Sequence, residues 1–140
     1  MTLLTLDEIE QARVSIAPVV RATTAAASHS LTRRLGREVW LKPEYRQRTG
    51  SFKIRGAYWR LKQLTAEEAS RGVVAYSSGN FAQGLAAAGQ ALGIPVTIVM
   101  PIDVPAAKRD ATAGYGATVV LTDHGERARE HARARVRDAH

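Results

Sequence analysis

One lysine and one short polar run have the residue types and spacing that could carry out chemistry. Lys53 lies within residues 49–56 (TGSFKIRG), at the predicted start of a helix. This placement is unusual, because the positive end of the helix dipole disfavours a cation. It suits a lysine that condenses with an aldehyde, because only the neutral amine is nucleophilic. The alternative is a surface lysine whose stem packs along Phe52, and the physical pattern alone favours that alternative.

The polar run Ser77, Ser78, Gly79 and Asn80 joins a predicted strand to a predicted helix. Backbone N–H groups at a helix N-terminus bind anions, and hydroxyl groups add donors. Ligands of open α/β sheets bind beyond the carboxyl ends of the strands, where this loop would lie. A carboxylate or a phosphate would suit the loop. Simple N-capping by Ser78 or Asn80 explains part of the run equally well, so both interpretations stay open.

The elements that would position these residues follow from hydrophobic periodicity and capping signals. Apolar residues recur at helical spacing after Ser51, which predicts a helix with a buried face formed by Ile54, Ala57, Tyr58 and Leu61. Thr5 with Glu8, and Thr65 with Glu68, have the spacing of capping boxes. Further helices are predicted over residues 5–16, 30–36, 80–92 and 105–115, after Thr65, and from about residue 125 onwards.

Four short strands are predicted, over residues 38–42, 72–76, 95–100 and 117–121. Strands that alternate with helices indicate βαβ units, and therefore an α/β fold with a parallel sheet. The small residues between Gly84 and Gly89 predict close packing of their helix on that sheet. The polar segment 65–72 is the predicted boundary between two lobes.

Composition narrows the class of protein. The chain has 140 residues, 45% of them hydrophobic, which is enough for one modest domain with a core. It has no cysteine, which excludes disulfides, and its four histidines do not form a pattern that predicts a metal site. The net charge of +7 could indicate nucleic-acid binding, but no aromatic residues are interleaved with the C-terminal arginines, so this is disfavoured. Without a signal peptide or an apolar span, a cytoplasmic protein that binds no membrane is expected.

Three stretches resemble fold-type II pyridoxal-phosphate enzymes, and most closely the threonine and serine dehydratases that are related to serine racemase. Residues 42–57 (KPEYRQRTGSFKIRGA) resemble the cofactor-lysine motif, residues 77–86 (SSGNFAQGLA) the substrate-carboxylate loop, and residues 93–121 the strand, helix and strand that follow. The stretches occur in the family's order and spacing. The first motif is specific enough to reverse the preference for a surface role of Lys53.

The resemblance implies a cofactor, a reaction and a set of site residues. The cofactor would be pyridoxal 5′-phosphate, and a small β-hydroxy amino acid would lose water to give a 2-oxo acid and ammonia. Lys53 and Ser78 would be catalytic, and Lys53, Phe52 and Asn80 would bind the cofactor. The substrate would be bound by Ser77, Ser78, Gly79, Asn80 and Phe81.

The resemblance also implies a domain organisation. Residues 1–64 would be the N-terminal part of the cofactor-binding large domain, and residues 65–140 an incomplete small α/β domain. Family members continue beyond this length, and their glycine-rich phosphate loop lies in that later part. We therefore expect weak cofactor binding or none by the chain alone, with a homo-oligomer or a complementing C-terminal chain to cover residues 1–64. The alternative function is a non-catalytic fragment, or an amino-acid-binding module that has lost the phosphate site.

Overall fold

The computed structural model describes residues 3–123 together with residues 130 and 134. The helix predicted from about residue 125 lies almost wholly outside these residues. The helices are α1 (Leu6–Ile16), α2 (His29–Leu35), α3 (Lys53–Lys62), α4 (Ala66–Arg71), α5 (Asn80–Leu92) and α6 (Ala106–Gly114). The strands are β1 (Ala26–Ala27), β2 (Trp40–Leu41), β3 (Val73–Tyr76), β4 (Val96–Pro101) and β5 (Thr118–Thr122), and two 3-10 turns span Glu44–Arg46 and Arg48–Gly50.

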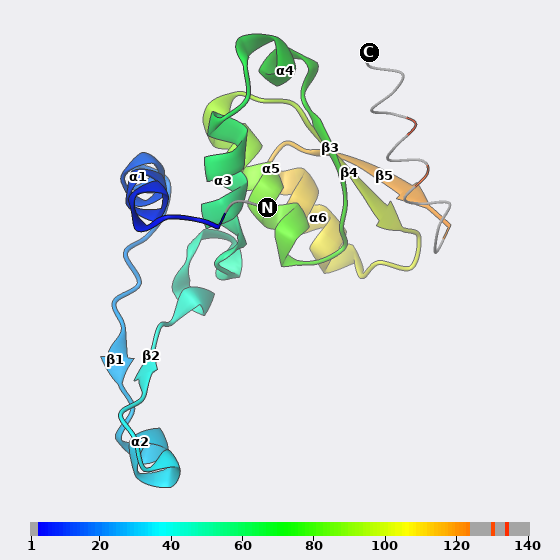
Figure 1. Cartoon of the computed structure of the whole chain (residues 1–140). Helices are drawn as coiled ribbons and strands as arrows, with labels where there is room; N and C mark the ends of the chain where they lie inside the picture. Colours follow the sequence, from blue (N-terminus) through cyan, green and yellow to red (C-terminus); the bar gives the residue numbers. More distant parts are fainter. Residues whose placement is uncertain (1–2, 124–129, 131–133, 135–140) are drawn as a thin grey trace.

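The body of the molecule is built on a parallel sheet in the order β3-β4-β5, which confirms the predicted βαβ organisation (Figure 1). The central strand β4 is almost wholly buried, and Ile98, Val99 and Met100 on it have no exposed surface. A strand buried on both faces is typical of such sheets and explains its continuous apolar run. The carboxyl ends of the strands therefore mark one edge of a well-packed unit.

Helix α5 lies at the centre of the packing, because it contacts α3, α6 and β4. Its small residues make this possible. A Cβ added at Gly89 would come within 2.3 Å of Val96 Cγ2, so the predicted close packing on the sheet is confirmed there. A Cβ added at Gly84 would instead meet the backbone of α3. The run of small residues therefore serves a helix–helix contact as well as a helix–sheet contact.

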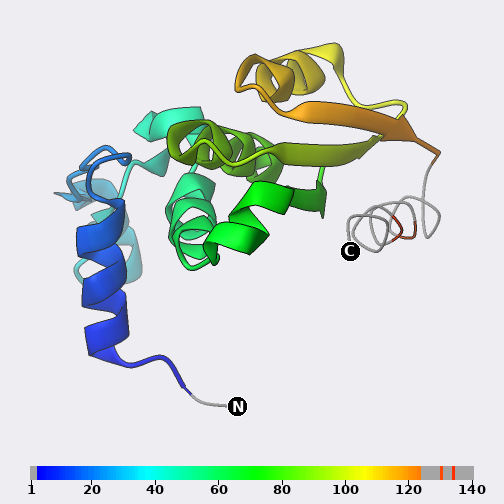
Figure 2. The ribbon, with the colours of Figure 1, turned by 90° about the horizontal axis from the view of Figure 1, so that it is seen from above.

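The face of α3 predicted to be buried, with Ile54 and Leu61 on it, is buried in the structure. Both predicted capping boxes are present, at the starts of α1 and α4. In each box a threonine hydroxyl and a glutamate three residues later satisfy each other's backbone N–H groups, which fixes where the helix begins. Figure 2 shows α1 standing beside the body, away from the sheet.

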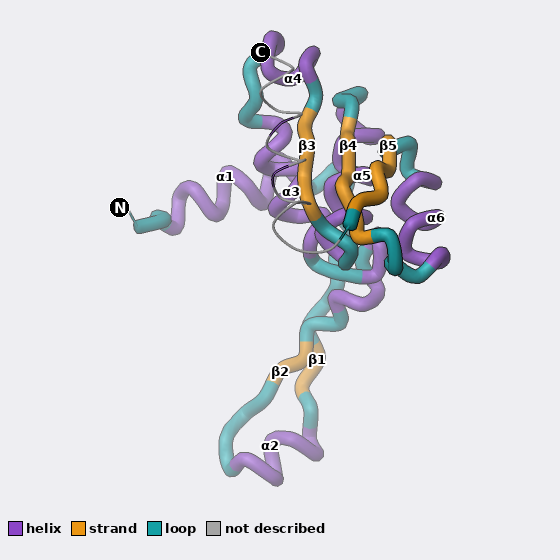
Figure 3. Tube along the Cα trace, turned by 90° about the vertical axis from the view of Figure 1, so that its right-hand side faces the viewer, coloured by secondary structure: helices purple, strands orange, loops and turns teal. Residues whose placement is uncertain are grey.

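Residues 24–42 form an arm that extends away from the body (Figures 1 and 3). Its strands β1 and β2 pair antiparallel, with Ala27 opposite Trp40, and α2 lies at its tip. No residue of α2 is buried, and Trp40 is 57% exposed. The predicted strand 38–42 is reduced to Trp40–Leu41, and β1 was not predicted, because two alanines carry no strand preference. The arm thus presents apolar side chains that the body does not cover.

Within the described residues, no helix is both long and apolar enough to cross a lipid bilayer.

Candidate active site

The backbone before α3 is held in a conformation that few residues adopt. Thr49 has a φ of 64°, in the left-handed region that is unfavourable for a β-branched residue, and Gly50 follows with a φ of 67°. The Thr49 hydroxyl oxygen is buried and has no hydrogen-bond partner in the described structure. The Lys53 N–H then donates to the Ser51 hydroxyl at 3.4 Å. The chain therefore enters α3 through a strained turn that leaves one buried polar atom without a partner in the described structure.

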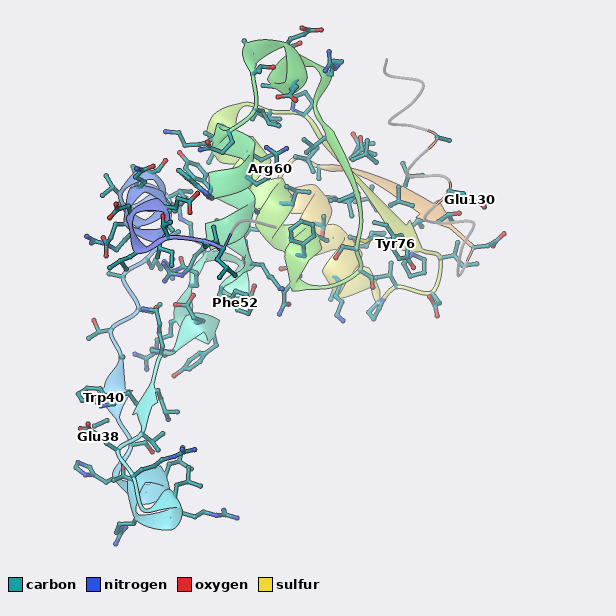
Figure 4. All side chains as sticks on the ribbon, viewed as in Figure 1. Glu38, Trp40, Phe52, Arg60, Tyr76 and Glu130 are labelled. Atoms are coloured by element: carbon teal, nitrogen blue, oxygen red, sulfur yellow. The ribbon has the colours of Figure 1, made fainter. Side chains whose placement is uncertain are left out.

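The side chain of Lys53 is half-buried at the first position of α3. Its Nζ lies 4.6 Å from the centre of the Phe52 ring, a cation–π contact. Phe52 itself is 56% exposed, and Figure 4 shows it at the lower end of α3, with Arg60 further along the same helix. No carboxylate of the described residues pairs with Lys53. The contact with Phe52 that the surface interpretation predicted is present, and Lys53 as a whole residue is only partly exposed.

The loop after β3 leaves the first amides of α5 without a side-chain cap. The Ser77 N–H donates to Val99 O at 3.1 Å and continues the sheet, and the Ser77 hydroxyl accepts from the Gly79 N–H at 3.4 Å. The N-cap residue of α5 is Gly79, which has no side chain to cap the helix. The explanation of this run as N-capping by Ser78 or Asn80 is therefore wrong. The free N–H groups and the positive end of the dipole favour an anion here.

A close contact between α3 and α5 brings the two predicted motifs together. A Cβ added at Gly84 would lie 2.9 Å from the Ile54 nitrogen, 3.0 Å from the Lys53 carbonyl carbon and 3.1 Å from Lys53 Cβ. Gly84 is one helical turn beyond Asn80, at the start of α5. Both helices begin at the end of the body where β3 finishes (Figure 1). Phe52 and Lys53 therefore lie near residues 77–81, although the two groups are distant in sequence. Together they form one corner of the body.

A polar cluster at the first turn of α3 was missed by the sequence interpretation. Arg55 binds the Glu44 carboxylate with two hydrogen bonds, from Nε to Oε2 at 2.9 Å and from NH2 to Oε1 at 2.8 Å. The Thr23 hydroxyl also donates to Glu44, and Lys42 Nζ donates to Thr23 O at 2.7 Å. The two strong Arg55 bonds, helped by Thr23 and opposed by burial, lower the pKa of Glu44 to about 2. The same pairing raises the pKa of Arg55.

The acid stability of the chain should depend on Glu44. Its pKa is 4.5 when unpaired and about 2 in the folded chain, so the pairing stabilises the fold above pH 4.5, and this is lost as the pH falls towards 2. We expect Glu44→Gln to unfold more easily in urea at pH 7 and to lose less of its remaining stability than the wild type between pH 5 and pH 2. The control is Glu10→Gln, since the Glu10–Arg13 pair is exposed. Parallel pH curves for Glu44→Gln and the wild type would contradict the assignment.

The protein has a parallel α/β fold, and at this corner the uncapped start of α5 lies close to the turn of α3 that carries a primary amine. Over residues 16–140 the sequence matches the family of pyridoxal-phosphate dependent enzymes, and the chain belongs to that family. An L-threonine ammonia-lyase of Thermotoga maritima is 49% identical over 119 residues, which are 85% of this chain and 30% of that protein. A catabolic L-threonine dehydratase of Staphylococcus aureus is 46% identical over 120 residues, or 85% of this chain and 35% of that protein.

Solved structures agree with the fold. A serine racemase from Dictyostelium discoideum superposes with a TM-score of 0.90 and 35% sequence identity, and the match covers 97% of this chain and 45% of that one. The predicted fold class, an α/β fold of the fold-type II pyridoxal-phosphate enzymes, is therefore confirmed. The chain spans about a third of the length of the curated relatives it matches.

The residues of the corner fit pyridoxal phosphate. The amine of Lys53 and the side chain of Asn80 make no hydrogen bond to other described residues, and the buried Thr49 hydroxyl has no partner. The uncapped amides of α5 and the hydroxyl of Ser78 add donors for an anion. An aldehyde needs an amine, and a carboxylate or phosphate needs N–H and O–H donors, so the groups match.

Proposed function

We propose that this chain supplies the lysine and the carboxylate-binding loop of a pyridoxal-phosphate dependent ammonia-lyase that acts on a β-hydroxy amino acid, threonine or serine. The observation that carries the proposal is the contact at Gly84, which brings the start of α3 next to the first turn of α5. The relatives named L-threonine ammonia-lyase and L-threonine dehydratase support this reaction class. The products would be a 2-oxo acid and ammonia.

Each residue of the corner would have a separate role in the reaction. Lys53 would hold the cofactor and, once released, would take the proton from the α-carbon of the substrate. Bound pyridoxal phosphate supplies an electron sink for this proton removal. Phe52 and Phe81 would give the site apolar walls, and the Asn80 amide would donate a hydrogen bond to the cofactor. The substrate carboxylate would be held by Ser77, Ser78, Gly79 and the uncapped amides of α5.

Ser78 would carry a proton on the face of the substrate opposite Lys53. Its hydroxyl makes no hydrogen bond to other described residues, so it is available to a ligand. A hydroxyl group can both donate and accept a proton.

The domain organisation is part of the same proposal. We propose that residues 1–64 belong to a larger cofactor-binding domain and residues 65–140 to a small domain. The exposed side chains of the arm, Leu35, Trp40 and Leu41, support this proposal, because apolar surface of this kind marks an interaction surface. A second copy of the chain or a complementing chain would cover the arm.

Reductive trapping tests the proposed function. The chain has four lysines, Lys42, Lys53, Lys62 and Lys108. We expect that incubation with pyridoxal phosphate, reduction with borohydride and peptide mapping will place the label on Lys53 in preference to the other three. A label that falls mainly on another lysine would refute the assignment.

The alternative, a non-catalytic module that binds an amino acid, rests on the uncapped amides of α5. It predicts no preferred label on Lys53, together with heat on titration with serine that disappears in Ser78→Ala.

A further inference from the structure

We infer that Glu44, acting through Arg55, is a positioning residue for Lys53. The inference rests on the proposed function, in which Lys53 holds the cofactor. Arg55 follows Lys53 by two residues in the first turn of α3. Side chains two positions apart on a helix point in nearly opposite directions. Through Arg55, the carboxylate of Glu44 therefore binds the first turn of α3 on the face away from the Lys53 side chain.

The Arg55–Glu44 ion pair is strong because it is bidentate and partly shielded from water. Both Arg55–Glu44 hydrogen bonds are shorter than 3.0 Å, and the two side chains are only 27% and 18% exposed. Bidentate arginine–carboxylate pairs fix orientation as well as distance. Rotation of the first turn about the axis of α3 would break both bonds at once. The direction in which Lys53 leaves the helix is thereby fixed.

The cluster also ties α3 to two other segments. Arg55 NH2 donates to the Thr23 hydroxyl at 3.3 Å and to Arg21 O at 3.4 Å. Gln47, which is 3% exposed, accepts from the Arg21 N–H at 2.8 Å and donates to Arg21 O at 2.8 Å. The segment 21–23, the loop 42–48 and α3 thus form one hydrogen-bonded unit.

The other side of the first turn is held by α5. The backbone of Lys53 and Ile54 lies against Gly84, where no side chain separates the two helices. The turn that carries Lys53 is therefore fixed from two directions, by Gly84 of α5 and by Glu44. Loss of the Glu44 carboxylate would remove the hold on one side of the turn and leave the contact with Gly84 in place.

The test compares the rate at which pyridoxal phosphate and borohydride modify each lysine of the full 140-residue chain. For Glu44→Gln we expect the ratio of Lys53 to Lys62 modification to fall about tenfold, because hydrogen bonds to charged groups are lost. Lys62 is an exposed residue at the far end of the same helix. General loosening of the fold would expose every lysine, whereas loss of positioning lowers Lys53 alone. Glu67→Gln, which breaks an exposed pair with Arg71, should leave the ratio unchanged.

A second variant keeps the test decisive if circular dichroism shows that Glu44→Gln does not fold. Thr23→Val removes one donor to Glu44 and keeps the Arg55 pair, so the ratio should fall by a smaller amount. If the wild type is labelled at Lys53 and the folded variants keep the wild-type ratio, the positioning role is overturned and the proposed function stands. If the wild type is not labelled at Lys53, the positioning role and the proposed function are both refuted.

Discussion

Lys53→Met should abolish the preferred pyridoxal-phosphate adduct that we expect on the wild-type chain after borohydride reduction, an adduct that reduction can accumulate even when binding is weak. Methionine keeps an unbranched side chain beside Phe52, so the fold should survive while the amine is lost. If Lys53 is the group that bonds to the aldehyde, its removal should leave only the slow, unselective labelling of the other three lysines. Intact-mass measurement reports the number of adducts on each chain.

The other lysines make good controls because their surroundings differ. Lys42 donates to Thr23 O at 2.7 Å and lies 3.9 Å from Glu44, so its ammonium is already paired. Lys62→Met changes an exposed lysine at the other end of α3 and should leave the trapped fraction as in the wild type. Equal adduct formation by Lys53→Met and by the wild type would show that Lys53 is not the lysine that binds the cofactor.

Gly84→Ala should destabilise the chain by about 1–3 kcal/mol, the usual cost of an added methyl group in a packed interior. The new Cβ would meet the Ile54 nitrogen at 2.9 Å and the Lys53 carbonyl carbon at 3.0 Å. These are backbone atoms, which cannot rotate away, so α3 must move from α5. The shift would also displace Lys53, so trapping should weaken. Urea unfolding measures the change in the free energy of unfolding.

Gly56→Ala is the matched control for this substitution. Gly56 lies inside α3, and a Cβ added there meets nothing within 4 Å. Alanine is the better helix former, so this variant should gain about 0.5–1 kcal/mol. If the two alanine variants change stability by the same amount and in the same direction, the close contact between α3 and α5 is not what limits the size of residue 84.

Local signals were enough to predict the elements that hold the site, because those signals lie within a few residues of one another. The Thr65–Glu68 capping box placed the start of α4, and the apolar spacing after Ser51 placed the buried face of α3. The alternation of apolar strands and helices was sufficient for the parallel sheet. The ends of β2 and the presence of β1 were not predictable, because two-residue strands depend on pairing with a distant partner.

The arrangement of the site needed contacts that no local pattern encodes. The cluster around Glu44 joins Arg21 to Arg55, residues that are 34 positions apart. By composition its loop shows only charged and turn-forming residues, and the motif resemblance of residues 42–57 assigned no role to Glu44 or Arg55. Gly84 is one of several small residues in α5, and nothing in its spacing shows that it faces α3 and not the sheet. Lys53 itself was identified by the resemblance of its motif, since the physical pattern alone favoured a surface role.

The most direct test asks which lysine lies near the start of α5. The chain has no cysteine, so Asn80→Cys introduces a single thiol at an exposed position. A short reagent that links a thiol to an amine, followed by peptide mapping, identifies the lysine within reach. The proposed arrangement predicts a crosslink between the introduced thiol and Lys53. A crosslink to Lys42, Lys62 or Lys108 with none to Lys53 would contradict it.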